Sequence, residues 1–129
     1  MTSYKRILLV DDNDDDNVYH SVVIRKAGFT GEIVVREDGL AGIEFLRSAD
    51  LNIPTLVLLD INMPKMVGFE VAEAAEPLIK ETRTVVIFML TSSASPYDRE
   101  RAAALEVISG FLTKPLTEQM VRDILEPAS

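Results

Sequence analysis

Cysteine is absent from the 129-residue sequence. The chain can therefore form no disulfide and no thiolate zinc site, and it has no cysteine nucleophile, which is compatible with a reducing cytosol. Low-complexity segments, repeats at solenoid spacing and a linker rich in Pro, Gly or Ser are missing as well. The chain is most simply one domain, large enough to bury roughly two-thirds of its unfolded surface.

Long hydrophobic runs are also lacking. The longest strongly apolar run covers residues 85–90, whereas a membrane-spanning helix needs about 20 apolar residues. Near the N-terminus only residues 7–10 form an apolar run before Asp11, and this run is too short for the core of a signal peptide. We therefore expect a soluble, cytoplasmic protein that does not bind membranes.

Basic residues are fewer than acidic ones: the chain has 13 Lys and Arg and 21 Asp and Glu, which gives a formal net charge of −8. Binding to nucleic acid needs a local excess of Lys and Arg, and the basic residues of this chain are scattered. The charge argues against nucleic acid as a partner. We expect instead a partner protein with a basic or amphipathic surface.

What the sequence does contain is a regular alternation of short apolar runs with segments of helical length. The predicted strands are residues 7–10, 33–35, 56–59, 85–90 and 110–112, and the predicted helices are residues 14–27, 40–49, 69–80, 96–107 and 118–125. Five strands that alternate with five helices imply right-handed crossovers. Continuous apolar strands indicate burial on both faces. We predict an α/β fold with a doubly wound, mostly parallel sheet.

Several predicted helices begin with residues that favour a helix start. Ser95 can cap the fourth helix, and Pro96 suits its first position. Asp38 and Thr117 are weaker examples of the same signal before the second and fifth helices.

Two helices have further predicted features. The first is expected to turn a stripe of Tyr19, Val23 and Ala27 toward the core and to end at Gly28. In the third, Pro77 is expected to end or kink the helix, because proline lacks the backbone N–H that a helix interior uses.

Chemically active side chains follow the predicted strands. Asp11 and Asp12 come after the first strand, Asp60 after the third, Thr91 after the fourth and Lys114 after the fifth. In an open parallel sheet the functional crevice lies beyond the carboxyl ends of the strands. Three carboxylates there suit a hard cation such as Mg²⁺. Beside such an ion, a carboxylate can attack a phosphoryl group, and a hydroxyl can donate to its oxygens.

Four motifs in this chain resemble the receiver domain of bacterial two-component response regulators. They are ILLVDDN at 7–13, LLDINMP at 58–64, MLTSS at 89–93 and GFLTKPL at 110–116. The resemblance covers essentially the whole chain, with the motifs in the family's order. It implies a flavodoxin-like fold with strand order 2-1-3-4-5. It also implies a signalling domain that is no enzyme, apart from catalysing its own phosphorylation and dephosphorylation.

The resemblance implies a role for each acidic residue near the strand ends. Asp60 corresponds to the phosphoaccepting aspartate and also contacts the metal. Asp12 corresponds to a direct Mg²⁺ ligand, and Asp11 binds the metal mainly through water. Asn62 would supply its backbone carbonyl to the ion.

The resemblance also implies a switch and a lysine. Thr91 corresponds to the switch hydroxyl, and Phe111 to the aromatic residue whose rotamer changes with it. Lys114 corresponds to the lysine that pairs with the carboxylates and the phosphoryl group, so that Asp60, Thr91 and Lys114 form the catalytic set. In this family the Lys114-Pro115 peptide bond is typically cis.

Other positions adjust this pattern. Asn13, Asn62 and Ser93 correspond to positions that tune the lifetime of the phosphoryl group. Val67 stands where the family usually has an acid, which should alter the capping of the loop more than the chemistry. Phe111 replaces the tyrosine of many relatives and so has no hydroxyl for a partner.

Three further aspartates, Asp14 to Asp16, follow the first motif and are expected to be structural. They fall in the first turn of a predicted helix, where each gains about 0.3 to 1 kcal/mol from the helix dipole and the free N–H groups. A calcium-binding EF-hand is excluded by spacing, because Asn17 and Val23 stand where that loop needs glycine and glutamate. The single histidine, His20, is expected to be an ordinary helix residue.

The leading hypothesis is a stand-alone receiver that takes phosphate from a sensor histidine kinase or a histidine phosphotransfer protein. The chain ends shortly after the last predicted helix, so we expect a single domain, residues 1–129, without an output domain. Another protein would then recognise the signal, and a homodimer could form through the fourth helix, fifth strand and fifth helix. The alternative is a relay intermediate or phosphate sink that passes phosphate to a histidine phosphotransfer domain.

Other functions fit the residues less well. A phosphatase of the haloacid dehalogenase type needs a second aspartate two residues after Asp60, where this chain has Asn62. A flavin-binding flavodoxin needs a phosphate cradle in its first loop, and the acids after Val10 would repel phosphate. A scaffold without phosphotransfer would not need the complete set of acids, hydroxyl and lysine.

Overall fold

The computed structural model describes residues 4–63, 67–92 and 95–125. Within these residues the chain alternates strands and helices in the order β1 (Arg6–Val10), α1 (Asp14–Lys26), β2 (Glu32–Arg36), α2 (Gly39–Ser48), β3 (Thr55–Leu59), α3 (Gly68–Ile79), β4 (Val85–Thr91), α4 (Pro96–Ala104), β5 (Ile108–Thr113) and α5 (Glu118–Leu125). The strands form one parallel sheet in the order β2-β1-β3-β4-β5. The predicted fold class and strand order are confirmed.

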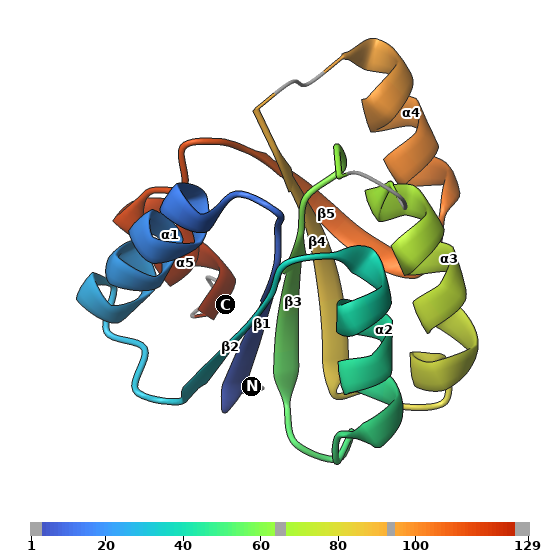
Figure 1. The fold of residues 1–129 in the computed structure, drawn as a ribbon, viewed down its shortest axis with the longest axis horizontal. Coiled ribbons are helices and arrows are strands. Elements are labelled where there is room, and N and C mark those ends of the chain that lie inside the picture. The colour runs from blue at the N-terminus through green and yellow to red at the C-terminus, as the bar shows by residue number, and fades with distance from the viewer. Residues whose placement is uncertain (1–3, 64–66, 93–94, 126–129) are drawn as a thin grey trace.

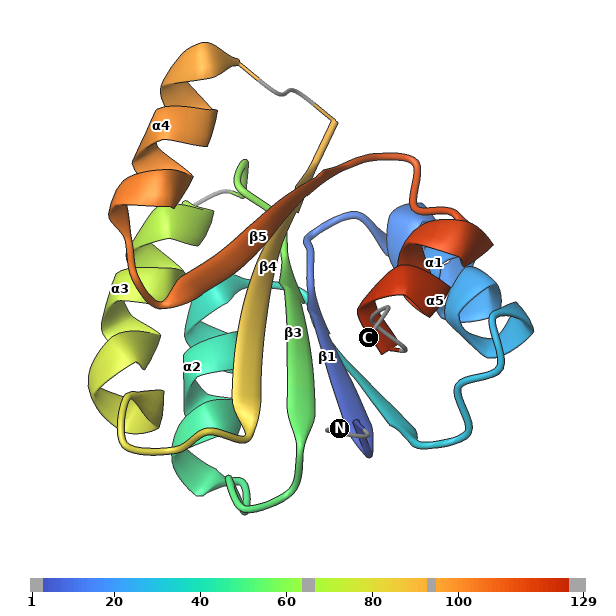
Figure 2. The same cartoon turned by 180° about the vertical axis from the view of Figure 1, so that it is seen from behind.

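The helices cover the sheet from both sides, as the continuous apolar strands predicted. Helices α1 and α5 pack together on one face, and α2, α3 and α4 lie on the other, as the two opposite views in Figures 1 and 2 show. This three-layer arrangement leaves the two ends of the strands uncovered by helices. The carboxyl ends therefore stay accessible for the site.

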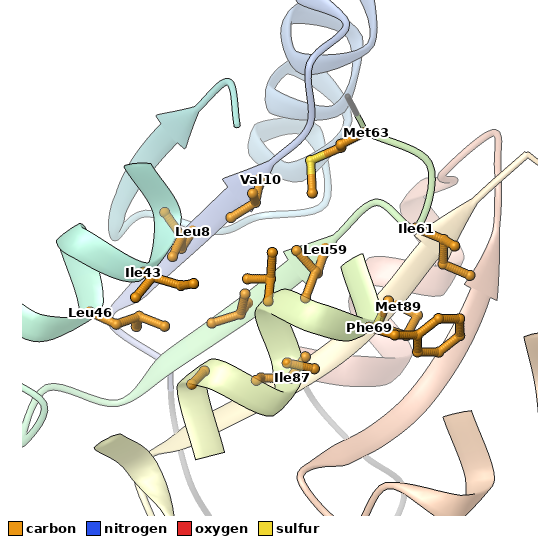
Figure 3. Packing of buried hydrophobic residues seen from close by; sticks show 14 of the residues in the cluster. Leu8, Val10, Ile43, Leu46, Leu59, Ile61, Met63, Phe69, Ile87 and Met89 are labelled. Atoms are coloured by element: carbon orange, nitrogen blue, oxygen red, sulfur yellow. The ribbon is translucent and has the colours of Figure 1, made fainter. Parts of the chain in front are cut away.

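Successive side chains of the central strands enter two separate cores. In β1, Leu8 and Val10 face α2 and α3, whereas Ile7 and Leu9 face α1 and α5. Figure 3 shows the first core, with Leu59 of β3 among its buried side chains. Burying each such side chain contributes roughly 1.5 to 3 kcal/mol. A slip of one residue would exchange the two faces, so the cores fix the register of the strands.

The register brings the ends of the strands to one edge. Val10 pairs with Leu59, and Leu59 in turn pairs with Met89. The residues that follow β1 and β3 therefore emerge side by side. In Figure 1 the loops after these strands lie at the upper edge of the sheet.

The buried face of α1 differs from the predicted stripe. Its buried residues are Asn17, His20, Val23 and Ile24, whereas Tyr19 is 49% exposed and Ala27 is the half-buried C-cap. The prediction counted apolar residues only, but two polar side chains share this face. The expected end of the helix is confirmed, since Gly28 has a φ of 104° that suits glycine.

The helix caps agree with the sequence pattern. Side-chain oxygens accept hydrogen bonds from backbone N–H groups in three pairs: Ser95 from Asp98, Asp38 from Ala41 and Thr117 from Met120. Each such cap contributes about 1 kcal/mol.

Helix α3 ends at Ile79, within one residue of the predicted end, so Pro77 lies inside the helix and does not end it. One helix end departs from expectation. Helix α4 ends at Ala104 instead of residue 107, because Leu105 takes extended backbone angles. From there the chain must reach the sheet quickly, since β5 already begins at Ile108, which pairs with Ile87 of β4.

Candidate functional site

Three carboxylates meet at the carboxyl edge of the sheet. Oxygens of Asp11, Asp12 and Asp60 all lie within 4.8 Å of one another. Asp11 and Asp60 are buried, with 4% and 7% of their surface exposed, while Asp12 is exposed. At an effective dielectric constant near 20, two charges about 5 Å apart repel by roughly 3 kcal/mol. The arrangement therefore favours a bound cation.

The ammonium group of Lys114, a residue near the C-terminus, lies beside this cluster. Its Nζ lies 2.8 Å from Oδ2 of Asp11, 2.7 Å from Oδ2 of Asp16 and 3.8 Å from Oδ1 of Asp60. Its backbone N–H donates to the carbonyl of Thr91 over 2.7 Å. The peptide bond to Pro115 is cis, as the resemblance implied. The site thus combines several carboxylates with one lysine.

Asp16 belongs with the site residues, contrary to the expectation that Asp14 to Asp16 are all structural. The sequence pattern groups it with Asp14 and Asp15 as a structural residue of the first helical turn, and all three do lie in that turn. The side chains of Asp14 and Asp15 are exposed, but that of Asp16 is half-buried and bonded to Lys114. Helical spacing explains the difference, because Asp16 lies one turn before the buried His20 and shares its face.

Burial and neighbouring charge oppose ionisation of Asp60. Burial, followed by the negative charge of Asp11, raises the pKa of Asp60 to about 6, although Lys114 and the backbone N–H of Asn62 act in the opposite direction. Ionised Asp60 is therefore unstable relative to an exposed aspartate. A cation beside it would relieve this instability.

Lys114 remains charged in this setting. Burial lowers the pKa of Lys114, but hydrogen bonds to Asp11 and Asp16 together with the charge of Asp60 outweigh it, so that the pKa lies above its ordinary value. The lysine is consequently a permanent positive charge at neutral pH.

Hydrogen bonds hold the loop between β1 and α1 in place. The side chain of Asn13 accepts from the backbone N–H of Asp16, and the N–H of Asn13 donates to the carboxylate of Asp11, each over 3.0 Å. Nδ2 of the buried Asn17 donates to the carbonyl of Asp11 over 2.9 Å. Sequence reasoning missed Asn17, and its signal would have been a polar residue on the buried face of an otherwise apolar helix.

The start of α3 lies against the end of β3 and Asp60. The N–H of Gly68 donates to the carbonyl of Ile61 over 2.8 Å. A Cβ atom added at Gly68 would overlap the carbonyl oxygen of Asp60, so only glycine lets the first turn of α3 lie this close. Val67 precedes the helix, and its N–H donates to the carboxylate of Glu70 over 3.1 Å. Valine offers no oxygen in return, which agrees with the altered capping expected there.

The remaining predicted residues lie along the last two strands. Thr91 is fully buried at the end of β4. Phe111 is half-buried in β5, and the guanidinium carbon of Arg99 on α4 lies 5.6 Å from the centre of its ring. Asn62 is exposed beside Asp60. Ser93 lies outside the described residues.

The donor set fits a hard divalent cation. Asp11, Asp12 and Asp60 offer only oxygen atoms, which Mg²⁺ and Mn²⁺ prefer, and no imidazole is among them. The repulsion among these carboxylates, offset in part by Lys114, independently favours such an ion.

Comparison with known proteins decides the family. Residues 7–126 match the response regulator receiver domain. The chain belongs to this family. Receiver domains are phosphoacceptor signalling modules, and this one is not a conventional enzyme. Its acidic pocket of Asp11, Asp12 and Asp60 and its Lys114 agree with that assignment.

Individual relatives support the same assignment. The receiver domain is 33% identical to the "Probable methanogenesis regulatory protein FilR2" of Methanothrix harundinacea over 93% of this chain and 78% of that protein. It is 32% identical to a crystal structure of a response regulator receiver protein from Dyadobacter fermentans, with a TM-score of 0.84 and coverage of 93% and 94%. Some curated relatives are much longer, and the chain spans 14% and 16% of two sensor kinases.

One solved relative contains a metal ion. The Mn²⁺-bound form of response regulator Rcp1, a protein of Synechocystis sp., is 30% identical, with 97% of each chain covered and a TM-score of 0.76. The acidic cluster of this receiver domain is likewise able to hold a metal ion. As a family, receiver domains partner with histidine kinases. Among the described residues, no helix is both long and apolar enough to cross a bilayer.

Proposed function

We propose that this receiver domain accepts a phosphoryl group on Asp60 from a sensor histidine kinase or a histidine phosphotransfer protein, with Mg²⁺ as the cofactor. The observation that carries the proposal is the position of Asp60. Its buried carboxylate lies within 4.8 Å of two further carboxylates and 3.8 Å from a lysine ammonium. The three carboxylates would hold a cation, and that cation and the ammonium would together supply positive charge where a phosphoryl group would arrive.

The chemistry is an in-line transfer of the phosphoryl group. A carboxylate oxygen of Asp60 forms a bond to phosphorus while the bond from phosphorus to the donor's imidazole nitrogen breaks. The electron pair of that bond stays on the nitrogen, which is left as a neutral imidazole once a proton is bound. Asp60 must be ionised for this attack. Lys114, which keeps its charge, lies close enough to stabilise the phosphoryl oxygens.

The resemblance to receiver domains implies the roles of the metal ligands. Asp12 and Asp60 would bind Mg²⁺ directly, Asp11 mainly through water, and Asn62 through its backbone carbonyl. When bound, Mg²⁺ supplies positive charge that offsets the charge of the transferred group. The exposure of Asp12 keeps this side of the cluster accessible to a hydrated ion.

The proposed switch uses Thr91 and Phe111. The Thr91 hydroxyl would donate to the phosphoryl oxygen, and Phe111 would change its packing in response. Phe111 already contacts α4 through the guanidinium of Arg99, so a change at β5 can reach that helix. The signal would then be recognised by another protein, or by a second copy, at the surface of α4, β5 and α5. Asn13, Asn62 and Ser93 would tune the lifetime of the phosphoryl group.

We further propose that residues 1–129 form one receiver domain and that it acts in the cytoplasm. The net charge of −8 supports proteins as partners in place of nucleic acid. The absence of a membrane-spanning helix among the described residues is consistent with this location.

The test is phosphorylation by a small donor. The protein is incubated with Mg²⁺ and acetyl phosphate, and its intact mass is measured. We expect a gain of one phosphoryl group in the wild type and none in Asp60→Asn, which keeps the size of the side chain but removes the nucleophilic carboxylate. Phosphate on Asp60→Asn would show that another residue is the acceptor. No gain in the wild type with any donor would refute the proposed function.

A further inference from the structure

Asp16 has a contact with the site that the proposed chemistry leaves unexplained. Its Oδ2 lies 2.7 Å from Nζ of Lys114, as close as the 2.8 Å contact with Asp11. Both contacts are ordinary hydrogen bonds between opposite charges. The distance from Nζ to Asp60 is 3.8 Å, which is too long for a hydrogen bond. Two acids thus hold the ammonium away from the proposed acceptor.

The N–H donors of the Lys114 ammonium are only partly used by Asp11 and Asp16. An ammonium group has three N–H donors, and those of Lys114 to Asp11 and Asp16 account for two within the described part of the chain. One donor remains for a further acceptor. The oxygens of a phosphoryl group on Asp60 would extend beyond the carboxylate oxygen that carries them. An ammonium placed 3.8 Å from that carboxylate can reach them without displacing its two existing partners.

Asp16 is itself held firmly. It lies in the first turn of α1, where the side chain of Asn13 accepts a hydrogen bond from its backbone N–H. The next residue, Asn17, is buried and bonded to the carbonyl of Asp11. The start of α1 is therefore anchored to the same loop that carries the acidic cluster. These hydrogen bonds fix the backbone that positions the carboxylate of Asp16 beside Lys114.

We propose that Asp16 is a positioning residue that keeps the Lys114 ammonium at a distance from Asp60 from which it can bind the incoming phosphoryl group. The role rests on the proposed function of Asp60. Without the charge of Asp16, the ammonium would keep its contact with Asp11 and move toward Asp60, the nearest carboxylate to which it is not yet hydrogen-bonded. The resulting ion pair would have to break before Asp60 attacks phosphorus, and the transfer would be slower.

The chain offers a matched control in Asp15. It is the preceding residue of the same helical turn and carries the same charge, but its side chain is exposed. Asp15→Asn and Asp16→Asn change the net charge and the charge near the helix start equally. A difference between the two variants therefore reports the contact with Lys114 and not the general electrostatic field.

The experiment measures the rate of phosphorylation at saturating acetyl phosphate and Mg²⁺, together with the Mg²⁺ affinity and thermal unfolding of each variant. We expect Asp16→Asn to be at least about fivefold slower than the wild type and Asp15→Asn to stay within about twofold, since misplacing a catalytic group typically slows a reaction by more than that. Mg²⁺ affinity should be the same in both variants. Asp16→Glu, which keeps the charge, should recover much of the rate.

A double variant separates positioning from a merely structural role. If Asp16 acts through Lys114, Asp16→Asn should cause no further slowing in a Lys114→Met background. An unchanged rate in Asp16→Asn, or an equal slowing with and without Lys114, would overturn the positioning role while phosphorylation of Asp60 still stood. Loss of wild-type phosphorylation, or its survival in Asp60→Asn, would instead overturn the proposed function itself.

Discussion

Asp60 is the residue of the site whose ionisation the fold opposes most clearly. Its pKa of about 6 in the folded state, caused first by burial and then by Asp11, compares with about 3.9 for an aspartate in an unfolded chain. Between these two values the folded protein binds more protons than the unfolded chain. Ionisation of Asp60 therefore lowers stability as the pH rises, with the loss complete above about pH 7 and absent below about pH 4.

Removing the charge of Asp60 should accordingly stabilise the metal-free protein. We expect Asp60→Asn to raise the free energy of unfolding by about 1 to 2 kcal/mol at about pH 7.5, since two pKa units correspond to roughly 2.7 kcal/mol before screening by solvent. Urea unfolding in the presence of a chelator measures this difference. The gain should disappear as the pH falls to about 4.

The control for this prediction is Asp15→Asn, which removes an equal charge from an exposed side chain of the same edge of the molecule. It should show no gain, because losing the interaction of Asp15 with the helix dipole costs about 0.3 to 1 kcal/mol. If Asp60→Asn destabilised the protein at neutral pH, the carboxylate would have to be stabilised in the folded state, contrary to the geometry.

For individual residues, the sequence predicted which side chains would meet at the ends of the strands. Asp11, Asp12, Asp60 and Lys114 converge as expected, because parallel strands in register end at one edge. It did not predict Asp16. Apolar periodicity assigns the buried face of a helix from its hydrophobic residues alone. In α1 the polar residues Asn17 and His20 are buried as well, and Asp16 beside them binds a lysine 98 positions away in the chain.

Among the secondary-structure elements, helix α3 begins close to the site without a side-chain hydrogen bond at its N-cap. Its N-cap, Val67, has the extended backbone angles that capping residues adopt, and its N–H donates to Glu70. The opposite hydrogen bond, from a helix N–H to the capping side chain, cannot form with valine. Half of a capping box is therefore present.

Completing this box should stabilise the protein. We expect Val67→Ser to be about 1 kcal/mol more stable than Val67→Ala, because both remove the valine side chain but only serine supplies an acceptor oxygen. Chemical denaturation of the two variants gives the difference directly. Equal stabilities would mean that the first turn of α3 obtains no hydrogen bond from this position.

Elements with strong apolar runs were predicted well, and β5 was not. The predicted strand, residues 110–112, is shorter than the observed Ile108–Thr113. Ser109 and Gly110 interrupt its pattern, yet the strand forms because β4 provides a partner, with a shift in register between Ile87 and Phe88. Gly110 lies against the ring of Phe88, where a Cβ atom would overlap it. Such a strand depends on tertiary contacts that no local pattern contains.

On the scale of the whole molecule, the acidic cluster couples metal binding to folding. The unfolded chain cannot bring Asp11, Asp12 and Asp60 together, so an ion that binds all three stabilises only the folded state. At a Mg²⁺ concentration about 100 times the dissociation constant, the gain is about 2.7 kcal/mol.

Mg²⁺ should therefore raise the melting temperature by several degrees, and a chelator should reverse the effect. In Asp12→Ala we expect most of this response to be lost, although the metal-free protein should be slightly more stable because one repulsive charge is gone. Asp15→Ala should respond to Mg²⁺ like the wild type. An equal loss of response in both variants would show that overall charge attracts the ion, and not the cluster.

Two ion pairs of Lys114 join distant parts of the chain, with sequence separations of 103 to Asp11 and 98 to Asp16. A ribosome makes all the acids of the site long before it makes the lysine, and domains are synthesised from the N-terminus. A nascent chain that already contains β1 to β3 thus holds mutually repelling carboxylates with no ammonium among them. The charged edge of the sheet can be completed only when β5 and the loop behind it are added.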